Sequence, residues 1–443
     1  MSVRVGMVSL GCPKNQVDAE RMMYSLRQSG FEIIQDAALA DIAVINTCGF
    51  IQSAKEEAIE TILEFCALKK EGRIKAIICT GCLAERYREE LKEQLPEVDA
   101  IVGIGSIGDI AKIAADVFNK TDSGMHFADK CCLPLDGGRI ISTQPFYAYL
   151  KIAEGCSNCC TYCAIPSIRG RFRSRPMENI LEEARWLADN GVTELVVVAQ
   201  DTTRYGEDIY GESRLPELLE ELCKIDGFKW IRTLYLYPER ITDRLIDVIA
   251  DNKKIVKYMD IPIQHCSGEV LKRMNRPGNC ESLKALFAKI RERIPDITLR
   301  TTLITGFPGE TEEQFEELAE FVNEVKFERL GCFAYSEEEG TPAAKLDGML
   351  PEEVRERRSE IIMEQQMFIN DALNQDMIGK HVEVVTEGFD RYAECCFGRS
   401  AADAPEIDGK IFFTSAKKLT VGEYVTVEIE DTLDCDLIGS VVE

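Results

Sequence analysis

The chain has 443 residues, which at about 150 residues per domain predicts roughly three domains. Hydrophobic residues make up 45% of it and charged residues 29%, a composition that excludes disorder as the main state. No apolar run approaches the roughly 18 residues that a membrane-spanning helix needs, and the start, MSVRVGMVSLGCPKN, has too short an apolar stretch for a signal peptide. We therefore expect a cytoplasmic protein with no membrane partner. Its formal net charge of −25 disfavours a phosphate backbone as partner and suits a basic one.

Residues 1–119 predict an N-terminal domain built on a doubly wound parallel sheet. Near-continuous Val and Ile runs, such as DIAVIN and KAIICT, are typical of strands that helices cover on both faces. Residues 120–145 contain turn-forming sequences and predict a linker. The expected strands are 3–9, 41–46, 74–80 and 100–104 with a short one at 31–35, and the expected helices are 15–29, 52–69, 84–94 and 106–118.

Residues 146–374 predict a second alternating series followed by a connecting helix at 352–374. Amphipathic helical segments separate six strands, which favours right-handed βα units and a partial (β/α)6 barrel. Chemistry in such a barrel belongs to the loops at the carboxyl ends of its strands. The expected strands are 146–152, 195–200, 230–237, 257–264, 297–305 and 328–336.

Residues 375–443 predict a third, smaller domain. Five short strands without intervening helices fit a small antiparallel β-barrel of the OB-like kind, a common platform for holding a macromolecular partner. The whole chain is therefore expected to be an α/β multidomain protein.

The 18 cysteines indicate metal or reactive sulfur, because a cytosolic chain is not expected to carry a disulfide framework. Cys156, Cys160 and Cys163 have the spacing C-x3-C-x2-C in the loop after the first barrel strand. Three thiolates so close can hold three irons of a [4Fe-4S] cluster and leave the fourth iron open. The competing interpretation is structural zinc, because Cys159 also permits C-x2-C-C-x2-C; tetrahedral zinc sites normally separate their ligand pairs by a longer loop.

Three more thiols follow three different strands of the N-terminal domain. Cys12, Cys48 and Cys82 each come after a predicted parallel strand, and the carboxyl ends of such strands converge on one crevice. Any one of them alone would more often be a small buried hydrophobe. Three at equivalent positions predict a second three-cysteine cluster site.

Other motifs carry weaker signals. GIGSIG at 103–108 matches a dinucleotide-binding pattern but lacks the following strand and its acidic residue, so it predicts a strand-to-helix turn. The three histidines are scattered, which argues against a zinc hydrolase; His265 alone ends a barrel strand. Gly306 follows the fifth barrel strand, where a nucleoside-like ligand or an ordinary turn would each explain it.

Taken together, Cys156, Cys160 and Cys163, with Tyr162 before the last cysteine, resemble the signature of radical S-adenosylmethionine enzymes. The preceding Cys12, Cys48 and Cys82 and the small barrel behind make the entire chain resemble a methylthiotransferase. Among such enzymes, those that modify ribosomal protein S-twelve are most similar in the motifs SLGCPKN, NTCGFI, YLKIAEGC, DIPIQH, GFPGET and GRSAADAPEIDG (398–409).

The resemblance implies two [4Fe-4S] clusters on those six cysteines, S-adenosylmethionine as a cofactor and a TRAM domain at the end of the chain. It also implies the reaction, methylthiolation of the β-carbon of an aspartate in that ribosomal protein, free or in the small ribosomal subunit, with an electron donor as a further partner. We expect Tyr162 to pack near the adenosine, and Gln200 and Gly306 to be weaker candidates for the same pocket. Cys159 is an extra thiol inside the loop.

Related methylthiotransferases that modify an adenosine in tRNA share both cysteine motifs, so the substrate prediction depends on the last domain. Residues 377–443 contain 6 basic and 14 acidic residues, a net charge of −8, which suits a basic protein better than RNA. Besides the tRNA enzyme, the alternatives are a non-catalytic iron-sulfur electron carrier and a zinc-stabilised binding module.

Overall fold

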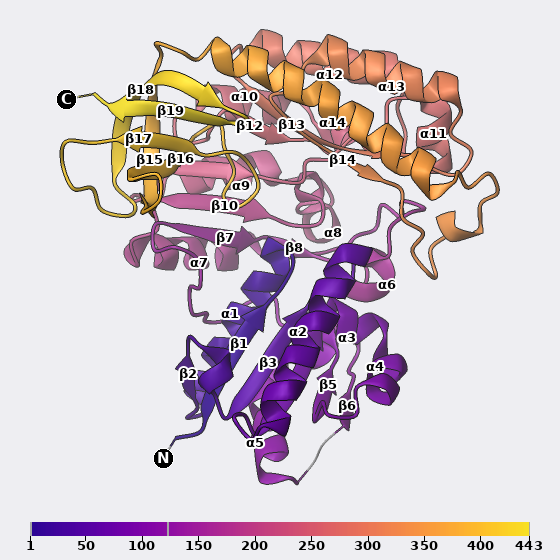
Figure 1. Ribbon diagram of the computed structural model, residues 1–443, viewed down its shortest axis with the longest axis vertical. Helices are drawn as coiled ribbons and strands as arrows, with labels where there is room; N and C mark the ends of the chain where they lie inside the picture. Colours follow the sequence, from indigo (N-terminus) through magenta and orange to yellow (C-terminus); the bar gives the residue numbers. More distant parts are fainter. Residues whose placement is uncertain (1, 122–123, 443) are drawn as a thin grey trace.

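The structure is a computed structural model of the chain and describes residues 2–121 and 124–442. A sheet domain lies at the lower end of Figure 1, a barrel of strands and helices lies above it, and a small closed barrel lies beside the latter. In the described residues no helix is long and apolar enough to cross a membrane. The predicted α/β multidomain fold is confirmed.

The N-terminal sheet has six parallel strands in the order β2-β1-β3-β4-β5-β6. Strands β3 and β4 are buried along their whole length, as expected between two layers of helices. The strands are β1 (Arg4–Ser9), β2 (Glu32–Ile34), β3 (Ile42–Thr47), β4 (Ala76–Gly81), β5 (Ala100–Val102) and β6 (Gly124–His126). The helices are α1 (Pro13–Gln28), α2 (Gln52–Lys70), α3 (Cys82–Arg86), α4 (Arg88–Gln94) and α5 (Ile110–Asn119), with 3-10 turns at Ala37–Leu39, Ile104–Asp109 and Lys130–Cys132.

Two features of this domain differ from the sequence prediction. Strand β6 lies in the segment predicted as a linker and pairs with the edge of β5; three residues are too few to show a periodic pattern. The helix predicted at 84–94 is two helices, because the backbone of Tyr87 leaves the helical region (φ −118°, ψ 48°). The first of them begins at Cys82 itself, directly after β4.

The predicted partial barrel is confirmed. Its six strands form two parallel groups, β11-β10-β7 and β12-β13-β14, and a parallel bridge between Ile231 and Ile255 joins the groups. The strands are β7 (Tyr147–Lys151), β10 (Glu194–Val198), β11 (Trp230–Thr233), β12 (Tyr258–Asp260), β13 (Thr298–Thr305) and β14 (Arg329–Ala334).

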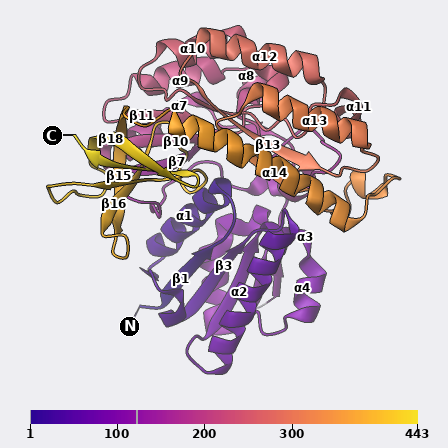
Figure 2. The same cartoon turned by 45° about the horizontal axis from the view of Figure 1, so that its top comes forward.

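Helices cover the outside of this barrel. The long helix α14 (Glu352–Gln375) runs along β14 (Figure 1) and packs against α13, which lies beside it in Figures 1 and 2. The outer helices are α7 (Met177–Asp189), α9 (Leu215–Cys223), α10 (Asp243–Asp251), α12 (Cys280–Arg293) and α13 (Glu312–Val325). Shorter elements near the loops are the antiparallel pair β8 (Ala153–Glu154) and β9 (Arg173–Ser174), and the helices α6 (Ile165–Arg169), α8 (Glu207–Tyr210) and α11 (Gly268–Arg273).

The C-terminal strands close into a small barrel in the order β15-β16-β17-β19-β18. It lies beside the central barrel in Figure 2. Its strands are β15 (His381–Asp390), β16 (Cys395–Ser400), β17 (Ile411–Thr414), β18 (Tyr424–Leu433) and β19 (Asp436–Val441).

The segment 398–409 runs from the end of β16 toward β17 and packs against the amino-terminal end of the central barrel. Its acidic side chains bind the first residue of three barrel strands. The bonds run from Tyr147 to Glu406 (3.0 Å), from Tyr258 to Asp408 (2.7 Å) and from Arg329 to Asp403 (2.5 Å). These are the amino ends of the strands, so the segment closes the barrel opposite to the loops where chemistry is expected.

Candidate functional site

The three N-terminal cysteines lie on loops that contact one another. A Cβ atom on Gly11 would lie 2.8 Å from Cys48 Sγ, and one on Gly49 would lie 3.0 Å from the carbonyl carbon of Cys82. Only glycine allows such close approach, so Gly11 brings the loop of Cys12 against that of Cys48, and Gly49 brings the latter against Cys82. The structure therefore brings the first predicted triplet together.

The pKa values of the three thiols are shifted in different directions. Burial alone would raise the pKa of Cys12, but Lys14, Arg169 and two backbone N–H groups lower it. Burial raises the pKa of Cys48, and it raises the pKa of Cys82 to about 12. Iron binds the thiolate form, so metal binding at this triplet releases protons from the two buried thiols.

The barrel triplet lies in a single loop between β8 and α6. Cys163 N–H donates to the carbonyl of Cys160 (3.0 Å), and Cys156 N–H donates to the carbonyl of Gly170 (3.1 Å). Burial raises the pKa of Cys156 to about 11 and that of Cys163 to about 12. Cys159 is exposed and has a left-handed backbone (φ 54°).

A second loop holds this cysteine loop in place, and the sequence analysis did not identify it. Thr161 N–H donates to the carbonyl of Met274 (3.0 Å), and its hydroxyl donates to the carbonyl of Arg273 (2.8 Å). The Asn275 side chain donates to the carbonyl of Cys159 (3.0 Å). Asn275 has a left-handed backbone, and the turn-forming sequence NRPGN was the available signal.

Tyr162 lies within the cysteine loop, beside a buried arginine. Burial raises its pKa well above the ordinary value, with Arg276 opposing and Cys160 adding to the shift. Arg276 also stacks on the ring of Tyr237, 4.2 Å from its centre. The predicted pocket residue thus belongs to a group of two tyrosines and an arginine beside Cys160.

The other two predicted pocket residues lie in different surroundings. The Gln200 amide donates to Glu154 (3.1 Å), while its buried carbonyl oxygen has no hydrogen-bond partner among the described residues, so it remains available to a ligand. A Cβ atom on Gly306 would lie 2.4 Å from the side chain of Arg355 on α14. Packing against α14 is therefore a sufficient reason for glycine at position 306.

Four fully buried charged side chains lie between the two triplets. Arg169 binds Asp18 (2.9 Å) and Glu154 (3.0 Å), and Lys151 binds the same two carboxylates. Burial opposes ionisation of Glu154, but Arg169 and Lys151 outweigh it and lower its pKa. Arg169 also donates to Cys82 Sγ (3.4 Å). Arg169 therefore contacts both Cys82 of the first triplet and Glu154, which lies two positions before Cys156.

Further ion pairs fix the N-terminal domain on the barrel. Glu183 of α7 binds Arg21 of α1 (3.1 Å), Arg139 (2.8 Å) and Arg175 (2.6 Å), all of them buried. Glu338, after β14, lies within ion-pair distance of two N-terminal side chains, Lys55 at 3.1 Å and Arg86 at 2.7 Å. The relative position of the two triplets is thus set at two separate places.

His265 is buried beside a carboxylate. It is fully buried, its Nδ1 accepts from the Ser267 N–H (3.0 Å), and its Nε2 lies 3.4 Å from Glu310. Glu310 in turn binds Arg358 of α14 (2.6 Å). The histidine is a partner of this buried carboxylate.

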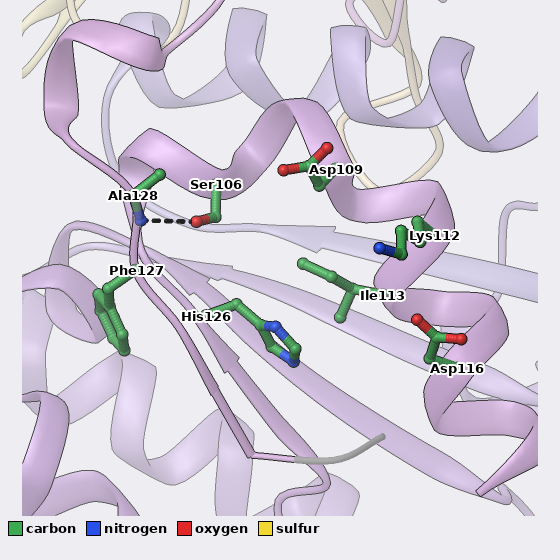
Figure 3. Close-up of a pocket in the computed structure, with 8 residues that line it drawn as sticks. All are labelled: Ser106, Asp109, Lys112, Ile113, Asp116, His126, Phe127 and Ala128. Carbon is green, nitrogen blue, oxygen red and sulfur yellow. Dashed lines mark hydrogen bonds between the residues drawn. The ribbon is translucent and has the colours of Figure 1, made fainter. Parts of the chain in front are cut away.

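A hollow of about 320 Å³ lies between α5 and β6, and Figure 3 shows its lining. The lining includes Asp109, Lys112, Asp116 and His126, and none of the predicted site residues. Across residues 2–121 and 124–442, no three His, Cys, Asp or Glu side chains are arranged to hold a single metal ion. A cubane cluster makes a different demand, because each thiolate binds a different iron.

Comparison with known proteins assigns the chain to a family. Residues 4–103 match the family described as "Uncharacterized protein family UPF0004", residues 150–322 the "Radical SAM superfamily" and residues 378–442 the "TRAM domain". The ribosomal protein uS12 methylthiotransferase RimO of Clostridioides difficile (strain 630) is 51% identical over 445 residues, covering 99% of each chain. The protein of the same name from Clostridium tetani (strain Massachusetts / E88) is 48% identical, covering 100% of this chain and 98% of that protein. The chain belongs to the RimO family of methylthiotransferases.

Membership of the RimO family confirms the resemblance found in the sequence and shows that the chain is a methylthiotransferase. It implies S-adenosylmethionine and [4Fe-4S] clusters as cofactors. The radical S-adenosylmethionine methyltransferase TsrM from Kitasatospora setae, solved with cobalamin and a [4Fe-4S] cluster bound, has a similar fold at 14% identity (TM-score 0.58, 77% of this chain and 74% of that one).

Proposed function

We propose that this enzyme methylthiolates the β-carbon of an aspartate in ribosomal protein uS12. The relatives that match it over their full length carry this substrate in their names. The observation that supports the chemistry best is the pair of three-cysteine groups on adjoining domains, with the buried Arg169 in contact with Cys82 and Glu154.

We assign one [4Fe-4S] cluster to Cys12, Cys48 and Cys82, and a second to Cys156, Cys160 and Cys163. Three thiolates fit a cubane that keeps one iron open, and Gly11 and Gly49 let the loops of the first triplet approach one another closely. When bound and reduced, the barrel cluster with S-adenosylmethionine supplies a carbon radical strong enough to take hydrogen from an unactivated C–H bond.

The chain's own residues position and shield that chemistry. The turn at 273–276 holds the cysteine loop by a backbone hydrogen bond and by hydrogen bonds from side chains, and Tyr162, Tyr237 and Arg276 lie beside Cys160. The unpartnered carbonyl oxygen of Gln200 is a hydrogen-bond acceptor for S-adenosylmethionine. The segment 398–409 closes the far end of the barrel and so keeps water from entering there.

The substrate surface that we propose lies on the C-terminal barrel. Exposed carboxylates gather on β18, where Glu428, Glu430 and Asp431 are all exposed. Phe389 and Tyr392, both exposed, add apolar area on β15 and the turn that follows it. An acidic surface of this kind attracts a basic protein and repels RNA phosphates.

The test is an anaerobic assay with reconstituted enzyme, S-adenosylmethionine, dithionite as electron donor, and either uS12 or tRNA. We expect one methylthio group on an aspartate of uS12 and none on tRNA. The variant Cys156→Ala should abolish cleavage of S-adenosylmethionine, whereas Cys48→Ala should keep cleavage and lose the methylthio product. Cys223→Ala, a half-buried thiol on α9, is the matched control and should keep both activities. A methylthio product on tRNA alone would reject the substrate assignment.

A further inference from the structure

Arg169 is the one described side chain that hydrogen-bonds both to a cysteine of the N-terminal triplet and to the strand leading into the barrel triplet. It is the last residue of α6, which begins two residues after Cys163. Its Nε donates to Cys82 Sγ (3.4 Å), while its Nη1 and Nη2 bind Glu154 (3.0 Å), Asp18 (2.9 Å) and Asn15 (3.1 Å). We propose that Arg169 is a positioning residue that sets the reduction potential of the cluster held by Cys12, Cys48 and Cys82. This inference rests on the cluster assignment of the proposed function.

The physical reason is the charge of the reduced state. Reduction adds one electron to the cluster and its thiolates, and no bond is made or broken. A hydrogen bond to a ligating sulfur and a nearby fixed cation both stabilise the more negative form, so they raise the potential. Arg169 is only 2% exposed, and the low dielectric around it strengthens both effects.

The carboxylates around Arg169 decide how much of its charge reaches the sulfur. Asp18 and Glu154 both bind Nη1 of Arg169, and both also bind Lys151. The two positive and two negative side chains therefore have a net charge of zero. The carboxylates hold the guanidinium with its Nε edge toward Cys82. Removing one of them should leave more positive charge for the cluster, and removing the guanidinium should leave less.

The measurement needs the N-terminal cluster alone. A full-length parent with Cys156, Cys160 and Cys163 replaced by Ala leaves this cluster as the only signal in an electron-paramagnetic-resonance titration with dithionite. In this parent, Arg169→Lys keeps a cation but loses the Nε hydrogen bond. We expect its ratio of reduced to oxidised cluster to fall roughly tenfold at a fixed potential, which is about 59 mV for a one-electron couple.

The matched control is Arg139→Lys. Arg139 is equally buried and binds carboxylates of both domains, Glu20 at 2.9 Å and Glu183 at 2.8 Å. Its described hydrogen bonds and ion pairs include no cysteine. The Arg139→Lys variant should therefore keep the potential of the parent even if it unfolds at a lower temperature.

A second variant gives the opposite sign. Asp18→Asn keeps the shape of the side chain and leaves Arg169 in place, so the potential should rise. If Asp18→Asn lowers the reduction potential or leaves it unchanged at full iron content, the inference is wrong. The Asp18→Asn result tests the inference even if the Arg169→Lys variant assembles no cluster. An equal potential in Arg169→Lys, Arg139→Lys and the parent also overturns it. Failure of the cluster assignment is distinct, because the parent would then contain no iron.

Discussion

Replacing Glu183 with Gln should destabilise the junction between the N-terminal domain and the barrel. The carboxylate is buried and binds Arg21, Arg139 and Arg175 at 2.6–3.1 Å. Breaking a buried ion pair costs about 3–5 kcal/mol, because the remaining charge stays buried without a partner. The pKa gives a second route to the magnitude. Burial opposes ionisation of Glu183, yet the arginines lower its pKa from 4.5 to about 2, which corresponds to about 3 kcal/mol.

The pH dependence has a definite sign. Because the pKa of Glu183 is lower in the folded state, its stabilisation is complete above the ordinary value of 4.5 and is lost as the pH falls toward 2. Thermal unfolding at neutral pH should show the barrel transition of Glu183→Gln lowered by roughly 6–12 °C. The difference in unfolding temperature between the Glu183→Gln variant and the unsubstituted protein should decrease as the pH is lowered from about 5.

The control is Glu182→Gln, which changes the exposed neighbour on the same helix. It should shift the unfolding temperature by less than about 2 °C, as surface substitutions usually do. Equal shifts in the two variants would show that the arginine cluster does not stabilise the junction. A gap that stays constant with pH would show that the charge of Glu183 is not the cause.

Three further substitutions test other parts of the structure. Gly306→Ala should destabilise the barrel by more than Gly340→Ala, since both glycines have positive φ but only the first would meet Arg355, at 2.4 Å; equal losses of unfolding temperature would exclude this packing. Glu338→Gln should lower the free energy of unfolding by about 3 kcal/mol, because two basic side chains of the N-terminal domain lose a buried anion. Hydrogen exchange at α2 and α3 should then accelerate, and unchanged exchange would contradict this prediction. Cys159→Ser should keep the full iron content of both clusters, and loss of four irons would instead make this thiol a ligand.

Much of the fold could be predicted because the decisive patterns are local. DIAVIN and KAIICT became β3 and β4, which are buried on both faces, and the six barrel strands appeared near their predicted ranges. Patterns too short to carry a period were missed, as with β6. The break at Tyr87 was also missed, since Glu, Leu and Lys around it all favour a helix.

The candidate site also has features that the sequence predicted and features that it did not. The cysteine triplets were recognisable because ligand spacing and strand ends are written in the sequence. The turn at Asn275 was not recognised, because its hydrogen bonds to the cysteine loop join residues more than 100 positions apart. Gly306 was a weaker pocket candidate because of its place after a strand, and only the structure shows that a Cβ atom there would meet Arg355 of α14.

The amino-acid sequence by itself determined the three-part architecture, the two groups of thiols and the family, since these depend on periodicity, spacing and composition. Only the tertiary structure decided that Arg169 reaches from the barrel loop to Cys82, that Glu183 gathers three arginines, and that residues 398–409 close the barrel from below. Such contacts join side chains far apart in the chain, and packing selects among the many partners that their charges would allow.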